Sequence, residues 1–404
     1  MTNGELKTII LYLGPCYMPT LLPTRFKTLM TASQAKIVNA RLVGRSGLWD
    51  LRVDHGQVVS VTETGDLGRD SAFVGETLDV SGDWVSLGGV DLQINGALGL
   101  AFPDLTIDRR AELRAIGEFL WEQGVDGYCP TIVTCSMQQV QQSLACVAGF
   151  QSKGPGHAEI LGVHLEGPFL NPEKRGAHPI EFIQPLTVEG VKRVLGDYAS
   201  LVKIVTLAPE MDPTGQAISY LRSLDIIVSL GHSQATAAEA KQAFDQGATM
   251  VTHAFNAMPG LHHREPGLLG QAIVDDRVRC GFIADGQHVT PIMLDILLRS
   301  SGSAGLFLVS DALSPLGLSD GDYPWDSRSI TVKNGTARLP DGTLSGTTRG
   351  LFYGALNLVQ WGLCDLEHAI TLCTISPRCA IVEPVKDDLR GSVAHLLRWP
   401  RHQL

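Results

Sequence analysis

The chain has 404 residues, of which 44% are hydrophobic and 18% charged, and its formal net charge is −10. This size can bury a large core, enough for one barrel domain and a smaller domain. The acidic balance argues against nucleic acid as the main partner, because binding a phosphate backbone requires a basic face. The eight cysteines form no CxxC pair, which favours reduced, buried thiols and a cytoplasmic protein.

Residues 1–35 do not have the pattern of a membrane or signal segment. The apolar stretch at 9–13 is followed by Gly14, Pro15 and further prolines. It is too short to span a bilayer, and the residues after it make a poor cleavage region. We expect a loose tail, or an extension that precedes a true start at Met30, and no association with membranes.

The two flanks of the chain alternate polar and apolar residues. Residues 36–82 do so, as in Leu51-Arg52-Val53-Asp54, and residues 329–345 repeat the pattern. Glycine and aspartate turns separate these stretches, so they are predicted to be short antiparallel strands. We expect residues 36–82, 329–349 and 380–404 to combine into one small β-sandwich.

Between the flanks, strand and helix patterns alternate eight times. The predicted strands are 84–93, 127–133, 160–165, 201–208, 226–230, 250–252, 279–284 and 306–309. The predicted helices are 108–123, 137–150, 187–195, 236–246, 291–299, 350–361 and 366–374. Apolar strands separated by helices imply a parallel sheet that is covered on its outer face. The sequence therefore predicts an α/β fold, a (β/α)8 barrel formed by residues 83–328 and 350–379.

Polar side chains recur where the predicted strands end. They are Gln93, Asn95, Thr131, Glu166, Glu210, His232, His253, Asp285 and Asp311. In a (β/α)8 barrel all these positions lie at the C-terminal mouth, where active sites are built. Chance would explain two or three such placements, but not nine.

Four of these residues have the chemistry of a hydrolytic metal site. Glu166, His232 and His253 are candidate ligands, and Asp311 is a candidate proton carrier. A single histidine is more often a packing residue, and a single aspartate after a strand is often a helix cap. Their joint placement at strand ends favours the metal site. His164, two residues before Glu166, is interpreted as barrel packing.

Seven motifs give the chain a specific resemblance. They are HLEGP (164–168), RGAHP (175–179), GHS (231–233), THAFNAMP (252–259), HREPG (263–267), ADGQHV (284–289) and SDA (310–312). In order and spacing they resemble the N-acetylglucosamine-6-phosphate deacetylase family of the amidohydrolase superfamily. The resemblance runs from about residue 36 to the C-terminus, and it implies a metal-dependent barrel with a flanking β-sandwich.

The resemblance also implies roles for individual residues. Glu166, His232 and His253 would hold one divalent metal ion, Zn²⁺ or alternatively Fe²⁺, Co²⁺ or Mn²⁺. Asp311 would act first as general base and then as general acid, and His178 would polarise the acetyl carbonyl. The residues implied in substrate binding are Asn256, Ala257, Arg264, His288, Gln93 and Asn95. In this family the arginine reaches the site of a neighbouring subunit, which implies a homodimer.

One departure from the superfamily pattern affects the number of metal ions. Many amidohydrolases carry His-x-His at the end of the first strand, where this chain has Gln93-Ile94-Asn95. Amides bind Zn²⁺ less well than imidazoles do, so a mononuclear site is favoured.

The expected activity is hydrolysis of N-acetylglucosamine 6-phosphate to glucosamine 6-phosphate and acetate, in amino-sugar breakdown or recycling. Another amidohydrolase, acting on a cyclic amide or an unphosphorylated sugar, would leave the Arg264 and His288 cations without a partner. A non-catalytic scaffold would be expected to have replaced a ligand or Asp311, and all four residues are present.

Overall fold

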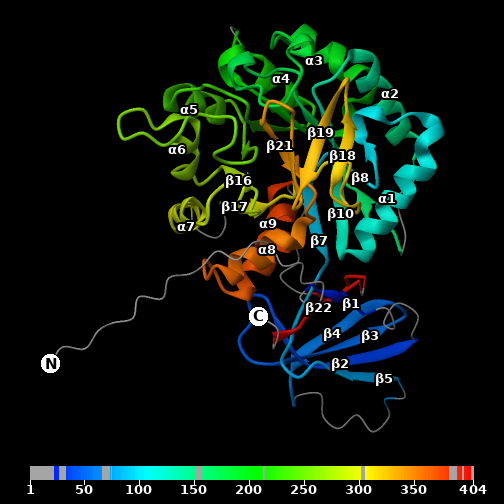
Figure 1. The fold of residues 1–404 in the computed structure, drawn as a ribbon. Helices are drawn as coiled ribbons and strands as arrows, with labels where there is room; N and C mark the ends of the chain where they lie inside the picture. The colour runs from blue at the N-terminus through cyan, green and yellow to red at the C-terminus, as the bar shows by residue number, and fades with distance from the viewer. Residues whose placement is uncertain are drawn as a thin grey trace, which may run out of the picture.

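The structure, a computed structural model, contains a parallel barrel with one β-sheet at each end (Figure 1). It describes residues 22–26, 33–65, 73, 75–150, 156–212, 214–301, 305–381, 389–393 and 395–401. In these ranges no helix has both the length and the apolar character needed to cross a bilayer. The predicted (β/α)8 architecture is confirmed.

The barrel consists of eight parallel strands in chain order. They are β7 (Gly89–Ile94), β10 (Val125–Val133), β12 (Val163–Glu166), β13 (Val202–Leu207), β14 (Ile227–Leu230), β15 (Met250–Val251), β16 (Arg279–Phe282) and β17 (Leu306–Leu308). The short β11 (Glu159–Ile160) also pairs with β10. Asp311 donates its backbone N–H to the Gln93 carbonyl at 2.9 Å, so the chain after β17 closes the barrel against β7.

Nine α-helices of the described chain surround the barrel or follow it. They are α1 (Arg110–Glu122), α2 (Met137–Ala148), α3 (Val188–Leu195), α4 (Ala217–Ser223), α5 (Ala237–Asp245), α6 (Gly267–Ile273), α7 (Pro291–Ser300), α8 (Leu351–Gln360) and α9 (Leu366–Ala380). The α2 and α5 helices begin with capping boxes at Ser136 and Thr236. The α4 and α6 helices were not predicted, because each has only seven residues and neither has a side-chain cap.

A seven-stranded sheet lies at the end of the barrel where its strands begin. Its members are β1 (Thr24–Arg25), β2 (Gln34–Leu42), β3 (Trp49–Asp54), β4 (Gln57–Glu63), β5 (Glu76–Asp79), β6 (Trp84–Ser86) and β22 (Leu397–Trp399). The C-terminal β22 pairs with both β1 and β6, so segments from the two ends of the sequence share this sheet. Most of its buried residues form a core separate from that of the barrel, whereas Leu397 and Trp399 of β22 pack into the barrel core.

The prediction that residues 329–349 join this flanking sheet was wrong. They belong to a separate four-stranded antiparallel sheet, hereafter the mouth sheet, which consists of β18 (Gly321–Trp325), β19 (Arg328–Lys333), β20 (Thr336–Arg338) and β21 (Leu344–Thr347). Its apolar face packs on Leu313 and Val133 at the barrel mouth. The alternating pattern identified the strands correctly, but it carries no information on which sheet they join. A small hairpin, β8 (Gly96–Ala97) with β9 (Leu100–Ala101), also follows β7.

The expected loose tail must be corrected for residues 24 and 25, which lie in β1, and for residues 34 and 35, which lie in β2. Residues 1–21 and 27–32 lie outside the described chain, but Arg25 is part of strand β1 and its side chain is only 4% exposed. Its guanidinium donates to the carbonyls of Trp121, Val125 and His395 at 2.8–3.0 Å. It also pairs with Asp126 at 2.8 Å and stacks on the Trp121 ring. Arg25 therefore fastens the flanking sheet to the barrel.

Replacing Arg25 with alanine should lower the free energy of unfolding by about 2–4 kcal/mol, because three buried carbonyls and a carboxylate lose a charged donor. Chemical denaturation followed by circular dichroism measures the change. Arg299→Ala, at a side chain that is 78% exposed, is the control and should stay within about 0.5 kcal/mol. An equally small effect of Arg25→Ala would show that this segment does not support the fold.

Candidate active site and metal centre

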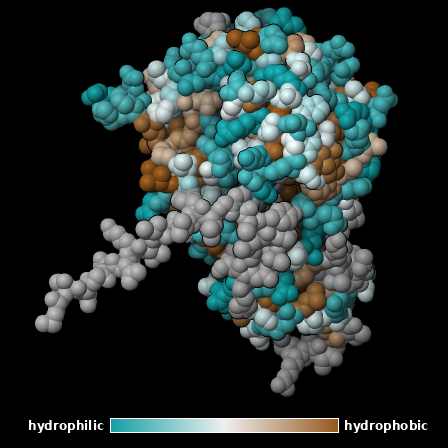
Figure 2. Space-filling view, viewed as in Figure 1, coloured by the Kyte–Doolittle hydropathy of each residue, from teal (hydrophilic) through white to brown (hydrophobic). Residues whose placement is uncertain are grey.

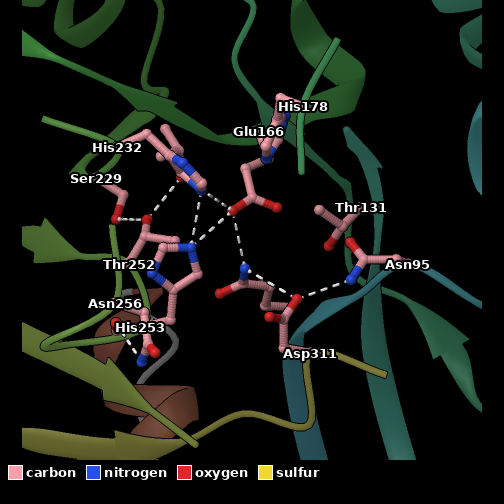
Figure 3. Close-up of polar contacts among 12 residues, drawn as sticks. Asn95, Thr131, Glu166, His178, Ser229, His232, Thr252, His253, Asn256 and Asp311 are labelled. Carbon is pink, nitrogen blue, oxygen red and sulfur yellow. Dashed lines mark hydrogen bonds and ion pairs between the residues drawn. The ribbon is translucent and has the colours of Figure 1, made fainter. Parts of the chain in front are cut away.

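Three candidate site residues lie where barrel strands turn into loops. His232 follows β14, His253 follows β15 and Asp311 follows β17, and all three are buried. Each has a positive φ, of 49°, 30° and 51° respectively. A non-glycine residue in this conformation costs about 1–3 kcal/mol, and such strain collects at functional sites. The turns direct these side chains into the barrel mouth, toward Glu166 at the end of β12 (Figure 3).

Glu166, His232 and His253 bring three ligand atoms together. Glu166 Oε1 lies 3.1 Å from His232 Nε2 and 3.0 Å from His253 Nε2, and the two Nε2 atoms are 3.0 Å apart. Within the described chain these residues form the one group of His, Cys, Asp or Glu side chains with metal-ligand spacing. Tetrahedral Zn²⁺ with bonds of roughly 2.0–2.1 Å would separate its ligands by about 3.3 Å. The arrangement fits a metal ion with little adjustment.

The hydrogen bond made by the other ring nitrogen of His232 supports the same conclusion. Its Nδ1 lies 2.8 Å from the Lys174 carbonyl oxygen. A carbonyl can only accept a hydrogen bond, so Nδ1 carries a hydrogen, and in the neutral ring Nε2 then presents a lone pair to the other ligands. Metal-binding histidines in proteins are commonly oriented by such a bond to a carbonyl. A cation among the ligands would relieve the repulsion between the Nε2 lone pair and the Glu166 carboxylate.

Asp311 lies opposite the ligand group, where two amides hold it. Asn95 Nδ2 donates to Asp311 Oδ1 at 2.7 Å, and Gln93 Nε2 donates to the same oxygen at 3.3 Å. Gln93 Nε2 also lies 3.1 Å from Glu166 Oε1, so one amide links the two carboxylates. Burial, and then the nearby Glu166 carboxylate, raises the pKa of Asp311 above its usual value. Such a carboxylate can take up a proton and release it again.

His178 completes this side of the site. It is buried, and its ring lies edge-on to that of His232 with centroids 4.4 Å apart. Burial, followed by the nearby His232, lowers the pKa of His178 to about 3, so the ring is neutral. The backbone N–H of Thr134 donates to His178 Nδ1 at 3.3 Å, which leaves the hydrogen on Nε2. His178 is therefore a neutral hydrogen-bond donor on the wall of the cavity.

These residues line a cavity of about 440 Å³ at the barrel mouth. Asn256, Ala257 and His288 line it as well, whereas Arg264 is exposed in the loop before α6 and lies outside the lining of this single chain. His288 Nδ1 is held by Asp285 Oδ2 at 2.8 Å. The mouth sheet contributes Trp325 and Asp326. The described chain thus brings together the predicted site residues apart from Arg264, with Gln93 contacting the site through the two carboxylates.

A chain of hydroxyl groups lies beneath the ligands. His164 Nδ1 donates to the Leu92 carbonyl at 3.0 Å, so its Nε2 accepts from Thr206 Oγ1 at 2.7 Å. Thr206 in turn accepts from Thr252 at 2.7 Å, and Thr252 accepts from Ser229 at 2.6 Å. One carbonyl therefore fixes the direction of every bond. This series of hydrogen bonds joins β7, β12, β13 and β14 with the residue after β15. His164 is therefore more than a packing residue.

Comparison with curated proteins finds relatives that match most of the chain. An N-acetylglucosamine-6-phosphate deacetylase of Danio rerio is 34% identical over 362 residues, which cover 87% of this chain and 88% of the relative. The chain belongs to the N-acetylglucosamine-6-phosphate deacetylase family. The deacetylase of Bacillus subtilis is 36% identical over 69% of this chain and 70% of the relative. A search of family models finds none that matches.

A solved structure supports membership of the deacetylase family. A point mutant of the Mycobacterium smegmatis deacetylase, in complex with N-acetyl-D-glucosamine-6-phosphate, has a TM-score of 0.79 and 27% identity, covering 89% of this chain and 93% of that one. The agreement extends over both the barrel and its flanks, as the resemblance in the sequence predicted.

Some contacts of this deacetylase site were not predicted from the sequence. Thr134 acts through its backbone N–H, and Lys174 acts on His232 through its backbone carbonyl, so the identity of the side chain gives no signal in either case. Glu210 was noted only as a strand-end residue. Its carboxylate accepts from Asn171 Nδ2 at 2.9 Å and Ser233 Oγ at 2.7 Å, and so braces the loops on both sides of His232. Its position after β13 was the available signal.

Replacing Glu166 or His232 with alanine should reduce bound divalent metal from about one equivalent per chain to a small fraction of that, since two ligands hold a cation far less tightly than three. Elemental analysis of purified, dialysed protein measures the content. His262→Ala, at an exposed histidine, is the control and should retain the metal. Full metal content in the Glu166 and His232 variants would place the metal site elsewhere.

Proposed function

We propose that the cavity hydrolyses the N-acetyl amide of N-acetylglucosamine 6-phosphate, with Glu166, His232 and His253 holding one divalent metal ion. The observation that carries this proposal is the convergence of those three ligand atoms opposite Asp311. The family supports the substrate, because members that match most of this chain are deacetylases of this sugar phosphate. Zn²⁺ suits the ligand set best, and Fe²⁺, Co²⁺ and Mn²⁺ accept the same ligands.

The bound cation would lower the pKa of a water molecule toward ~7 and polarise the acetyl carbonyl. Asp311 takes a proton from the water molecule as the water oxygen bonds to the acetyl carbonyl carbon. His178 donates its Nε2–H to the carbonyl oxygen, where negative charge develops. Asp311 delivers the proton to the amine nitrogen as the C–N bond breaks, and acetate and glucosamine 6-phosphate leave. The raised pKa of Asp311 suits both transfers.

Gln93 and Asn95 have a supporting role in this mechanism. Both donate to Asp311 Oδ1, so the other carboxylate oxygen remains free to exchange the proton. The sequence suggested that they bind substrate. We propose instead that they orient Asp311, and that Asn95, which lines the cavity, also faces the sugar.

Asp311→Asn should reduce kcat by about 10²- to 10⁴-fold, because the amide cannot exchange the proton although the donors from Asn95 and Gln93 can be retained. The assay is acetate release from N-acetylglucosamine 6-phosphate and, in parallel, from N-acetylglucosamine. We expect the wild-type protein to cleave the phosphorylated sugar with the higher kcat/KM. Equal cleavage of the two sugars would contradict phosphate recognition, and full activity of Asp311→Asn would contradict the proton-transfer role.

We also propose a cytoplasmic homodimer in which Arg264 binds the phosphate held in the neighbouring subunit's site, together with His288 and the Asn256-Ala257 turn. Arg264 is exposed and outside the cavity of its own chain.

Apolar side chains are exposed close to Arg264 in sequence and on the adjacent helix. Val274 after α6 and Ile292 on α7 are 73% and 70% exposed. Figure 2 shows hydrophobic residues on the flank where Figure 1 labels α6 and α7. Burial of such a patch by a second subunit would be favourable.

Mixing subunits tests whether Arg264 acts across the dimer. Arg264→Ala and Asp311→Asn homodimers should each be weakly active. A heterodimer pairs one intact Asp311 with Arg264 from the other chain, so mixed and reassociated protein should regain up to about a quarter of wild-type activity at subsaturating substrate. The result is measured as kcat/KM after controlled dissociation. No recovery in a verified heterodimer would show that Arg264 serves its own site or none.

A further inference from the structure

We propose that Lys174 is the cation within each subunit that recognises the phosphate of the substrate. Lys174 lies in the loop after β12 and is one of the residues that line the cavity. It was not among the residues that the sequence singled out. This inference rests on the proposed function, because it assigns a role in binding the same phosphorylated sugar.

The charge of the cavity is the first observation. The described residues that line it include five carboxylates. Lys174 is the single lysine or arginine among them. The carboxylates are Asp104, Glu166, Glu173, Asp311 and Asp326. Arg328 neutralises Asp326 from outside the lining, and a divalent cation would offset two further charges. Without Lys174 the lining that one chain contributes would keep a net negative charge, which opposes a phosphate dianion because a charge in a partly buried site is screened less than one in water.

The position of the ammonium group is the second observation. Lys174 Nζ lies 3.4 Å from the carbonyl oxygen of Met258, which directly follows Asn256 and Ala257, the turn proposed above to bind the phosphate. Phe255 and Ala257 have positive φ in this turn, at 75° and 51°. Backbone turns of this type direct N–H groups to a common point and bind anions. The ammonium therefore lies beside the segment expected to cradle the phosphate.

The free donors of Lys174 are the third observation. An ammonium group has three N–H donors. Within the described chain the side chain makes one hydrogen bond, to Met258, and no ion pair with a carboxylate. Two donors remain for an anion. The Lys174 backbone carbonyl orients His232, so the loop that binds the metal ligand also carries the charge that recognises the substrate. Replacing the side chain leaves the carbonyl in place.

The test compares Lys174→Met, which keeps the aliphatic stem, with Lys174→Arg, which keeps the charge. We expect Lys174→Met to raise KM for N-acetylglucosamine 6-phosphate about tenfold or more, because a charge-assisted hydrogen bond is lost, with kcat changed less than about twofold. The kcat/KM for N-acetylglucosamine should not change. Lys174→Arg should restore most of the affinity. Lys192→Met on α3 removes the same charge from the surface and should match the wild type.

Inorganic phosphate gives a second measurement that does not depend on turnover. Calorimetric titration of the metal-loaded protein should show phosphate binding that weakens about tenfold or more in Lys174→Met and remains in Lys192→Met. Unchanged phosphate affinity and KM in Lys174→Met would overturn the proposal. So would an equal rise in KM for both sugars, because that would indicate an effect on cavity shape.

The two proposals fail in different ways. If the wild-type protein cleaves both sugars equally or neither, the proposed function fails before any Lys174 variant is considered, and the phosphate titration still decides whether Lys174 binds an anion. If the wild-type protein prefers the phosphorylated sugar and Lys174→Met retains that preference, only the role of Lys174 is lost.

Discussion

The site depends on the close approach of three ligand atoms to one another. A carboxylate oxygen and two imidazole nitrogens lie about 3 Å apart in a region from which bulk water is largely excluded. Such an arrangement is unfavourable for lone pairs alone and favourable around a cation. The positive φ values at His232 and His253 add to the cost. The folding free energy of the barrel must therefore offset the cost of this site, and metal binding would offset part of it.

The barrel supplies that stability on two levels. Below the ligands, the series of hydrogen bonds from Ser229 to the Leu92 carbonyl fixes the alignment of the strands that carry Glu166 and His253. Above them, loop contacts fix the side chains, as the Lys174 carbonyl does for His232 and the Thr134 N–H does for His178. The lower level consists of side chains and the upper level largely of backbone groups. This division means that conservative substitutions in the loops can preserve the geometry of the ligands while altering what the cavity binds.

The sequence was most informative where a residue's chemistry and its position along a strand coincide. The eight strands followed from their apolar pattern, and Glu166, His232 and His253 followed from their places at strand ends. It was least informative about pairing between distant segments. Residues 329–349 alternate polar and apolar side chains as strands do. Their partners, however, are set by the apolar surface around Leu313, which no local pattern reveals. Arg25 likewise had no local signal, because its partners lie about a hundred residues or more away.

The mouth sheet has a consequence for the size of molecule that can react. Trp325 and Asp326 at the end of one hairpin, with residues 343–345, form one wall of a cavity of about 440 Å³. Arg328 ties this wall to the Ala177 carbonyl at 2.7 Å, beside His178. A volume near the lower end of the range for small-molecule pockets matches a single sugar, so the rest of a longer glycan would have to lie outside this wall. A polymer would therefore make few contacts with the cavity beyond one sugar, and we expect monosaccharides to be the preferred substrates.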